Sequence, residues 1–277
     1  MKWAEKTFGC PTECTCDQWR VNCEGKNLSH VPSKIPLTTK ELMLQKNNIT
    51  SLPHIDLNYL SELVYLDCSQ NQLKLDPHFS FTGPTKLIYL DLSVNRIAYV
   101  SHHTLSQLEK LMLLNLSSNP NLTLIEKEAF RGNPLLMYLD VSGCGLKHVD
   151  DDVFEHLSNL HILGINNNPW RCDCALLEFC TWIEETTIEL TNTADILCKE
   201  PKAFQDHQLF GMVQHGLHFA CLVHLETHDF LIMALIAFCI FFGGIFVAWL
   251  VGISTVMYYH PIMKADDESD EEECRMT

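Results

Sequence analysis

The sequence predicts an α/β fold: an extracellular solenoid of about six short repeats with a disulfide cap at each end, followed by one transmembrane helix. Three observations predict it. An apolar motif recurs about every 24 residues, cysteines cluster at both flanks of the repeats, and 28 residues near the C-terminus carry no formal charge. A short repeat buries its apolar side chains only against the repeats before and after it, so the units have to stack.

Each repeat follows the pattern Leu-x-x-Leu-x-Leu-x-x-Asn-x-Leu, which residues 87–97 match best. The asparagine position recurs at intervals of 24 or 25 residues, at Asn47, Asn71, Asn95, Asn119, Cys144 and Asn168. This period is that of leucine-rich repeats. A second apolar ladder precedes the first leucine of five repeats by six residues, at Leu57, Phe81, Leu105, Phe130 and Phe154. We expect both ladders in the core, with the asparagine amides satisfying backbone groups inside the stack.

Three repeats depart from the pattern. Cys144 takes the asparagine position, which the repeat pattern allows, and Thr39 replaces the first leucine of repeat one. The fourth repeat carries one extra residue around 119–122. We interpret the first repeat as a degenerate repeat at the edge of the solenoid, and the extra residue as a bulged turn.

Thirteen cysteines are too many for an ordinary cytosolic domain, so either metal or disulfides account for them. Their spacing favours disulfides, because a zinc ribbon needs two short Cys-x-x-Cys pairs well apart in the chain. The 14 histidines form no zinc-protease motif. We therefore predict no metal site and no cofactor. No recurring set of nucleophile, base and orienting residue is present in the sequence, so we expect no enzymatic activity.

The formal net charge is −16. Residues 1–229 carry 17 Lys and Arg against 28 Asp and Glu, and residues 260–277 carry 2 against 7. Such a chain repels phosphate backbones, so we expect no nucleic-acid partner.

The sequence divides into seven segments. They are an N-terminal remnant (1–9), a cysteine-rich N-terminal cap (10–37), the repeats (38–167), a cysteine-rich C-terminal cap (168–223), a juxtamembrane linker (224–229), a transmembrane helix (230–257) and an acidic cytoplasmic tail (258–277). The first residues contain no apolar stretch that serves as a signal peptide, so we expect that a leader was removed or lost.

Both cysteine-rich flanks resemble the caps of extracellular leucine-rich repeats. The resemblance implies the disulfides Cys10–Cys16 and Cys14–Cys23 in the first cap, and Cys172–Cys198 and Cys174–Cys221 in the second. Cys180 is left over, on the same face of the predicted helix 175–185 as Leu176 and Ile183. Cys68 occupies an inward strand position. We predict that both are buried free thiols.

Glycosylation sequons occur at Asn27, Asn48, Asn115 and Asn121, and all four are plausible acceptors. Asn115 lies between Leu114 and Leu116, so strand alternation turns its side chain onto the concave face, where many repeat proteins bind ligands. A glycan there would stand in the middle of that face.

The same face carries three columns of polar side chains: Tyr65, Tyr89 and Tyr138; Asp67, Asp91 and Asp140; and Ser69, Ser93, Ser117 and Ser142. These columns have two interpretations. They form an aromatic and acidic binding strip, or they are the aspartate and serine common at these positions of the repeat. We favour the second.

Residues 230–257 predict a helix of roughly 42 Å at about 1.5 Å per residue, against a hydrocarbon core of about 30 Å. It spans the bilayer with tilt or a protruding end. The disulfide caps place the N-terminal domain outside the cell, which predicts a single-pass type I protein of the plasma membrane in contact with membrane lipid. The tail is acidic and solvated, suited to a basic cytoplasmic surface, and contains a conceivable phosphorylation site at Ser269.

The predicted helix has two different faces. Residues at i, i+4 and i+8 define them: Phe238, Phe242 and Phe246 on a bulky face, and Gly244, Ala248 and Gly252 on a smooth face about 200° away. Either the helix packs specifically against another helix, or it is a passive anchor whose apolar residues fell into this arrangement by chance. We favour specific packing.

Residues 63–68, 86–93, 237–244 and 248–250 resemble the leucine-rich-repeat auxiliary (gamma) subunits of large-conductance Slo-type potassium channels. The likeness is greatest to the member paired with the alkalisation-activated sperm channel. It implies a protein that does not conduct ions but eases voltage-dependent opening of a pore-forming subunit, its partner. Some members carry a basic cluster at the cytoplasmic side of the membrane, whereas this chain has little beyond Lys264 there. The alternative is a single-span adhesion or ligand-binding receptor that uses the concave face.

Overall fold

The computed structural model describes residues 9–52, 57–150, 152–212, 217–218, 221 and 227–275. The chain divides into two compact units, Met1–Cys221 and Leu222–Thr277. Nearly all of the predicted N-terminal remnant and half of the predicted linker lie outside the described residues. In the second unit, side chains are described over residues 231–257.

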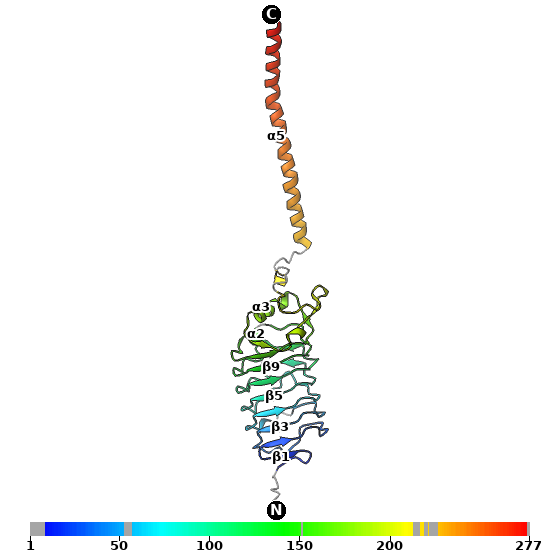
Figure 1. Ribbon diagram of the computed structural model, residues 1–277, viewed down its shortest axis with the longest axis vertical. Helices are drawn as coiled ribbons and strands as arrows, with labels where there is room; N and C mark the ends of the chain where they lie inside the picture. Colours follow the sequence, from blue (N-terminus) through cyan, green and yellow to red (C-terminus); the bar gives the residue numbers. More distant parts are fainter. Residues whose placement is uncertain are drawn as a thin grey trace, which may run out of the picture. The chain divides into compact units, whose positions relative to one another are not determined.

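One nine-stranded sheet runs through the first unit (Figure 1). Its strands follow in the order β1 (Thr15–Asp17), β2 (Arg20–Asn22), β3 (Glu41–Met43), β4 (Tyr65–Asp67), β5 (Tyr89–Asp91), β7 (Leu113–Asn115), β9 (Tyr138–Asp140), β10 (Ile162–Gly164) and β12 (Glu189–Leu190). The first two strands form an antiparallel hairpin, and each later pairing is parallel. Parallel pairing follows because each repeat returns the chain to the same side before the next strand begins.

The strands pair in the register of the repeat, so equivalent residues lie side by side in successive strands. Tyr65 pairs with Tyr89, and Tyr89 with Leu113. The central residue of each repeat strand points inward and is fully buried: Leu42, Leu66, Leu90, Leu114, Leu139 and Leu163. The second predicted ladder, from Leu57 to Phe154, is buried as well. Both predicted core ladders are therefore confirmed.

The asparagine ladder lies inside the stack. The Asn95 Nδ2 donates to the carbonyl oxygens of Cys68, Leu92 and Ser93, each at 3.0 Å. Its Oδ1 accepts from the Leu73 N–H at 2.9 Å. One amide thus joins its own turn to the preceding repeat, as the sequence pattern predicts.

The first unit also contains shorter elements. They are β6 (Tyr99–Val100) paired with β8 (Leu124–Ile125), α2 (Asp152–Glu155), β11 (Trp170–Arg171) paired with β13 (Cys198–Glu200), α3 (Leu177–Glu185), and the 3-10 turns η1 (Cys174–Leu176), η2 (Thr193–Asp195) and η3 (Lys202–Phe204). The predicted helix over 175–185 is thus observed as η1 followed by α3.

Disulfides close both ends of the solenoid. They join Cys10 to Cys16, Cys14 to Cys23, Cys172 to Cys198 and Cys174 to Cys221, the pairs that the resemblance implies. The first cap is the β1–β2 hairpin, whose second strand continues the sheet into β3. The hairpin is therefore hydrogen-bonded to the first repeat and covers its apolar edge.

The described residues of the second unit form one helix, α5 (Thr227–Arg275). Its apolar stretch, Leu231–Met257, is long and apolar enough to cross a membrane. The sequence interpretation ends the helix at residue 257, whereas the helical backbone continues through the acidic tail to Arg275. The side chains of the tail, including Ser269, lie outside those that the structure describes.

Candidate functional site: the membrane helix and the open strand face

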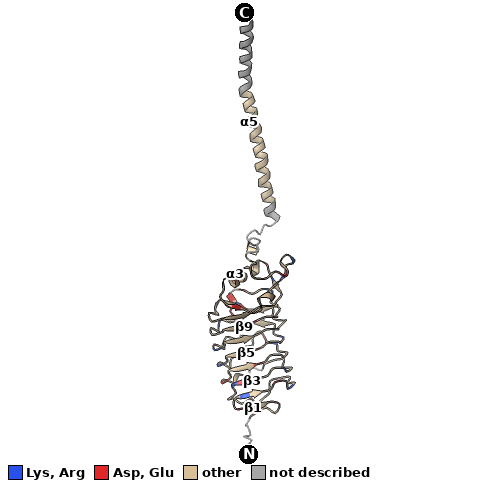
Figure 2. Ribbon diagram, viewed as in Figure 1, with Lys and Arg blue, Asp and Glu red and all other residues tan. Residues whose placement is uncertain are grey.

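The apolar part of α5 contains no charged residue among its described side chains (Figure 2). Its large side chains are exposed, among them Phe238, Phe246 and Trp249. A helix of 27 residues measures about 40 Å at 1.5 Å per residue, more than the roughly 30 Å hydrocarbon core. Its surface is therefore available to lipid and to other transmembrane helices.

The bulky face predicted from the sequence is formed by interacting aromatic rings. The centroids of Phe238 and Phe242 lie 4.1 Å apart. Phe241 meets Phe242 edge to face, with centroids 5.4 Å apart and an interplanar angle of 87°. Phe246 lies one turn further along the same face and is exposed. The phenylalanines restrict one another and present a ridge.

The smooth face is open. A Cβ atom placed on Gly244 or Gly252 meets no heavy atom within 4 Å. On the C-terminal side of Gly244, the small residues leave a shallow apolar depression lined by Ala248, Trp249, Gly252, Ile253, Val256 and Met257. A second helix can approach the backbone closely where side chains are this small.

The open strand face of the sheet is the predicted concave face and carries the three polar columns. Tyr65 and Tyr89 stack with ring centroids 4.2 Å apart and an interplanar angle of 11°. Asp91 accepts from the Ser93 N–H at 2.8 Å through Oδ1, and from the Tyr89 hydroxyl at 3.3 Å through Oδ2. Asp140 repeats both contacts with Ser142 and Tyr138. The aspartates thus close the turns after their strands, as the favoured interpretation of these columns requires.

Burial raises the pKa values of side chains on this face. Burial raises the pKa of Tyr138 to about 12, and the charge of Asp140 contributes to the increase. Burial also raises the pKa of Asp67, against the opposing effect of hydrogen bonds from Ser69, and the negative charge of Asp91 raises it again. Asp67 is therefore partly desolvated and is repelled by the charge of Asp91.

The four sequons differ in their surroundings. Asn27, Asn48 and Asn121 are exposed. Asn115 is half-buried: its Oδ1 accepts from the Ser117 N–H at 3.0 Å, and its Nδ2 donates to Asp91 Oδ2 at 3.2 Å. Asn115 therefore replaces aspartate in the carboxylate column and closes its turn in the same way. Glycosylation of all four remains a prediction.

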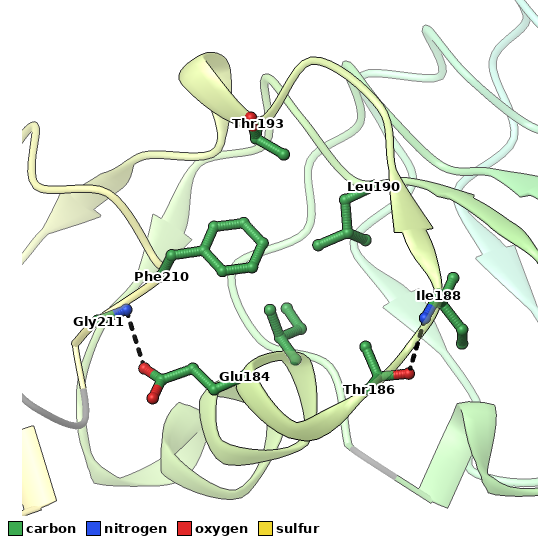
Figure 3. A pocket seen from close by; sticks show the side chains of 8 residues that line it. Glu184, Thr186, Ile188, Leu190, Thr193, Phe210 and Gly211 are labelled. Atoms are coloured by element: carbon green, nitrogen blue, oxygen red, sulfur yellow. Dashed lines mark hydrogen bonds between the residues drawn. The ribbon is translucent and has the colours of Figure 1, made fainter.

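The C-terminal cap contains a cavity of about 510 Å³ (Figure 3). Phe210 and Leu190 project into it from opposite walls, and Ile183 also lines it. The Glu184 Oε1 accepts from the Gly211 N–H at 2.9 Å, and the Thr186 hydroxyl accepts from the Ile188 N–H. The Glu184 contact thus joins α3 to Gly211, whereas the Thr186 contact closes a local turn after α3.

An exposed apolar column on the open strand face escaped the sequence interpretation. Ile88, Met112 and Met137 precede β5, β7 and β9, and each is more than a third exposed. In the sequence, these residues share one feature. Each occupies the second position of its repeat, directly after the buried first leucine. In a single repeat such a residue is indistinguishable from core, so alignment of several repeats is needed to detect it.

Comparison with known proteins identifies two family models within the chain. The leucine-rich-repeat model matches residues 61–120, 85–146 and 109–169, and the leucine-rich-repeat N-terminal domain model matches residues 9–36. Among solved structures, the crystal structure of human 5T4 (Wnt-activated inhibitory factor 1, trophoblast glycoprotein) aligns with a TM-score of 0.47 at 21% sequence identity, covering 81% of this chain and 99% of that chain.

Two relatives extend over nearly the whole chain. Leucine-rich repeat-containing protein 52 of Homo sapiens is 44% identical over 263 residues, which cover 95% of this chain and 84% of the human protein. The Mus musculus protein of the same name is 36% identical over 264 residues, with the same two coverages. Both relatives are more than 30% identical to this chain over 95% of its length, so the chain belongs to the family of leucine-rich repeat-containing protein 52.

Proposed function

We propose that this protein is an auxiliary subunit that modulates the voltage-dependent gating of a large-conductance, Slo-type potassium channel through α5. The observation that carries the proposal is the open smooth face at Gly244, Ala248 and Gly252, on the side of the helix opposite the aromatic ridge of Phe238 and Phe242. The smooth face packs against a transmembrane helix of the pore-forming subunit, and the ridge fixes the rotation of α5.

Packing of this kind does not depend on hydrophobicity. Lipid tails are as apolar as leucine, so helices associate in a bilayer through close contact and interhelical hydrogen bonds. Where Gly244 and Gly252 carry no side chain, a neighbouring helix reaches the α5 backbone and gains dispersion contacts that lipid makes less well. A helix whose surface is bulky all round lacks this possibility.

The energy required is modest. Moving one charge through 100 mV is worth about 2.3 kcal/mol, so a shift of about 50 mV in a channel that moves two or three charges needs roughly 2–3 kcal/mol. Helix packing that differs between the open and closed channel supplies such a difference, in particular when several copies bind. Only the difference in packing free energy between the open and closed channel changes gating.

The proposal places the protein in the plasma membrane as a type I, single-pass protein in contact with the channel and with lipid. Disulfides persist in oxidising compartments, which supports an extracellular position for the first unit. We assign the exposed Asn27, Asn48 and Asn121 as glycan acceptors on that unit.

Patch-clamp recording tests the proposal. The full-length chain is co-expressed with a Slo-type channel, and the half-activation voltage is compared for the wild type, Gly244→Leu and Gly252→Leu. We expect each leucine to return the half-activation voltage towards that of the channel alone and to weaken co-purification, because it holds the partner helix away.

Gly243→Leu is the matched control. A Cβ atom placed on Gly243 also meets no heavy atom within 4 Å, but it points about 100° away from that of Gly244 around the helix. We expect this variant to leave the voltage shift intact. If the three variants reach the surface equally and behave alike, the smooth face is not the contact.

A further inference from the structure

The cavity in the C-terminal cap has the size and the lining of a small-molecule site. We call it the cap cavity; its walls come from α3, β12, η2 and residues 210–211, all within the first unit. Its volume of about 510 Å³ falls in the range of ligand pockets, roughly 300–1,000 Å³. The channel proposal uses none of its residues.

The middle of the cap cavity is apolar. Ile188, Leu190 and Phe210 pack against the core of the first unit but are only partly buried. Phe210 and Leu190 project into the cavity from opposite walls (Figure 3). The wall that carries Phe210 is held by Leu209 and Met212, which are fully buried on either side of it. The cavity is therefore preformed and leaves an apolar space between two anchored walls.

One carboxylate is fixed beside this apolar space. The Glu184 Oε1 accepts from the Gly211 N–H at 2.9 Å, and Gly211 has a φ of 78°, a left-handed conformation that glycine adopts without strain. Because Gly211 directly follows Phe210, this bond holds the carboxylate on the wall that carries the ring (Figure 3). Among the described residues, the Glu184 Oε2 has no hydrogen-bond or ion-pair partner. That oxygen is open to a donor from a ligand.

The charge around the cavity favours a cation. Residues 175–197 contain no lysine, arginine or histidine but five carboxylates, at Glu178, Glu184, Glu185, Glu189 and Asp195. None of the five forms an ion pair within the described part of the chain, and Lys199, the next cation in the sequence, is paired with Asp206 at 3.1 Å. A cation that enters the cavity is therefore attracted, whereas an anion meets uncompensated negative charge.

We propose that the cap cavity binds a small primary amine with an apolar body, in its ammonium form. The ammonium donates to the Glu184 Oε2 and lies against the face of the Phe210 ring. The apolar body fills the space between Phe210 and Leu190. The site uses no residue of α5 and none of the three polar columns of the open strand face.

Isothermal titration calorimetry of the purified full-length chain tests the site with three probes of similar shape. They are phenethylammonium, the neutral phenethyl alcohol and the anion phenylacetate. We expect affinity to fall in that order, and the affinity for phenethylammonium to fall further as salt is added. The neutral probe measures the apolar contact without the charge.

Two variants separate the role of the charge from that of the space. Glu184→Gln removes the charge, while its side-chain oxygen still accepts from the Gly211 N–H. We expect it to lower the affinity for phenethylammonium about tenfold or more and to leave that for phenethyl alcohol unchanged. Leu190→Trp fills the cavity and is expected to abolish binding of all three probes.

Glu185→Gln is the matched control, since Glu185 is the next residue of α3, is exposed and does not line the cavity. We expect this variant to bind phenethylammonium as the wild type does. Absence of saturable phenethylammonium binding, equal affinities for the three probes, or equal losses in Glu184→Gln and Glu185→Gln overturns the proposal. A failed channel experiment leaves it unaffected, because the cap cavity contains no residue of α5.

Discussion

Cys144 takes the place of an asparagine in the buried ladder, and the neighbouring turn explains why this is tolerated. Its thiol reaches the Leu116 oxygen at 3.4 Å, as an asparagine Nδ2 does elsewhere in the ladder. A cysteine lacks the amide oxygen that accepts the Leu73 N–H at Asn95. Here the equivalent donor, the Leu122 N–H, bonds to the Asn119 carbonyl at 2.9 Å. The extra residue of this repeat closes that turn, so the two departures from the pattern compensate each other.

This compensation predicts an asymmetry between two reciprocal substitutions. Asn95→Cys leaves the buried Leu73 N–H without its acceptor and is expected to lower the free energy of unfolding by about 2–3 kcal/mol. Cys144→Asn leaves no backbone N–H unpaired, because the Leu122 N–H already has a partner, and is expected to cost only about 1 kcal/mol for burying an amide oxygen without that donor. Thermal unfolding of the detergent-solubilised chain measures both. Equal losses would contradict the explanation.

The free thiols Cys68, Cys144 and Cys180 are buried, which confirms the predictions for Cys68 and Cys180. Burial raises the pKa of Cys144 and of Cys180 to about 12, and raises that of Cys68 as well. Burial opposes ionisation of these thiols only in the folded state. Their contribution to the free energy of unfolding is therefore fully present below their ordinary pKa of 9.0. It declines as the pH rises from there towards 12.

We therefore expect these three thiols to resist alkylation at pH 8 in the native protein and to react fully in urea. The thiolate fraction at that pH is on the order of 10⁻⁴ for a pKa near 12, and burial excludes the reagent as well. Mass spectrometry of iodoacetamide adducts reports each cysteine separately. Rapid native labelling of any of the three would show that its site opens readily.

At the scale of elements, the C-terminal cap protects the last repeat with aromatic side chains. Trp170 is fully buried, and its Nε1 donates to the Ile165 oxygen at 3.1 Å. Phe154 and Phe179 stack against Trp182, with centroids 5.1 and 5.9 Å away. The cap is thus a small core of its own, continuous with the repeats and fixed by two disulfides.

Loss of one disulfide should loosen this cap. Cys172→Ser with Cys198→Ser opens a bridge between residues 26 apart and is expected to cost about 2–4 kcal/mol of unfolding free energy. Cys180→Ser, which alters a buried cysteine without breaking a bridge, is expected to cost about 1 kcal/mol. Thermal unfolding and surface expression compare the two. A larger effect of Cys180→Ser would place the stability of the cap in its helix.

At the scale of the whole molecule, the two units have different kinds of surface. The first unit buries its apolar ladders within itself and is closed at both ends. The described side chains of α5 are almost all exposed. The solenoid core is therefore complete without the helix, and we expect the two units to act separately.

Exchange of α5 with the transmembrane helix of an unrelated single-span protein tests this separation. We expect the shift in channel half-activation voltage to follow residues 230–257 of this chain. Under the receptor alternative, ligand binding follows residues 1–229. Electrophysiology and flow cytometry on the same two chimeras give both readouts. A voltage shift that follows the solenoid instead would contradict modulation through α5.

Much of this architecture was predictable from the sequence because its causes are local or strictly periodic. A 24-residue period places Leu66, Leu90 and Leu114 in one buried row, and a long uncharged run predicts α5 wherever the rest of the chain lies. Other features depend on contacts between successive repeats, and only the tertiary structure decided them. Asn115 engages Asp91 from the preceding repeat, and Ile88, Met112 and Met137 form a surface only once their strands are adjacent. Each of these residues is ordinary within its own repeat, so its role becomes visible only when parallel pairing aligns one repeat with the next.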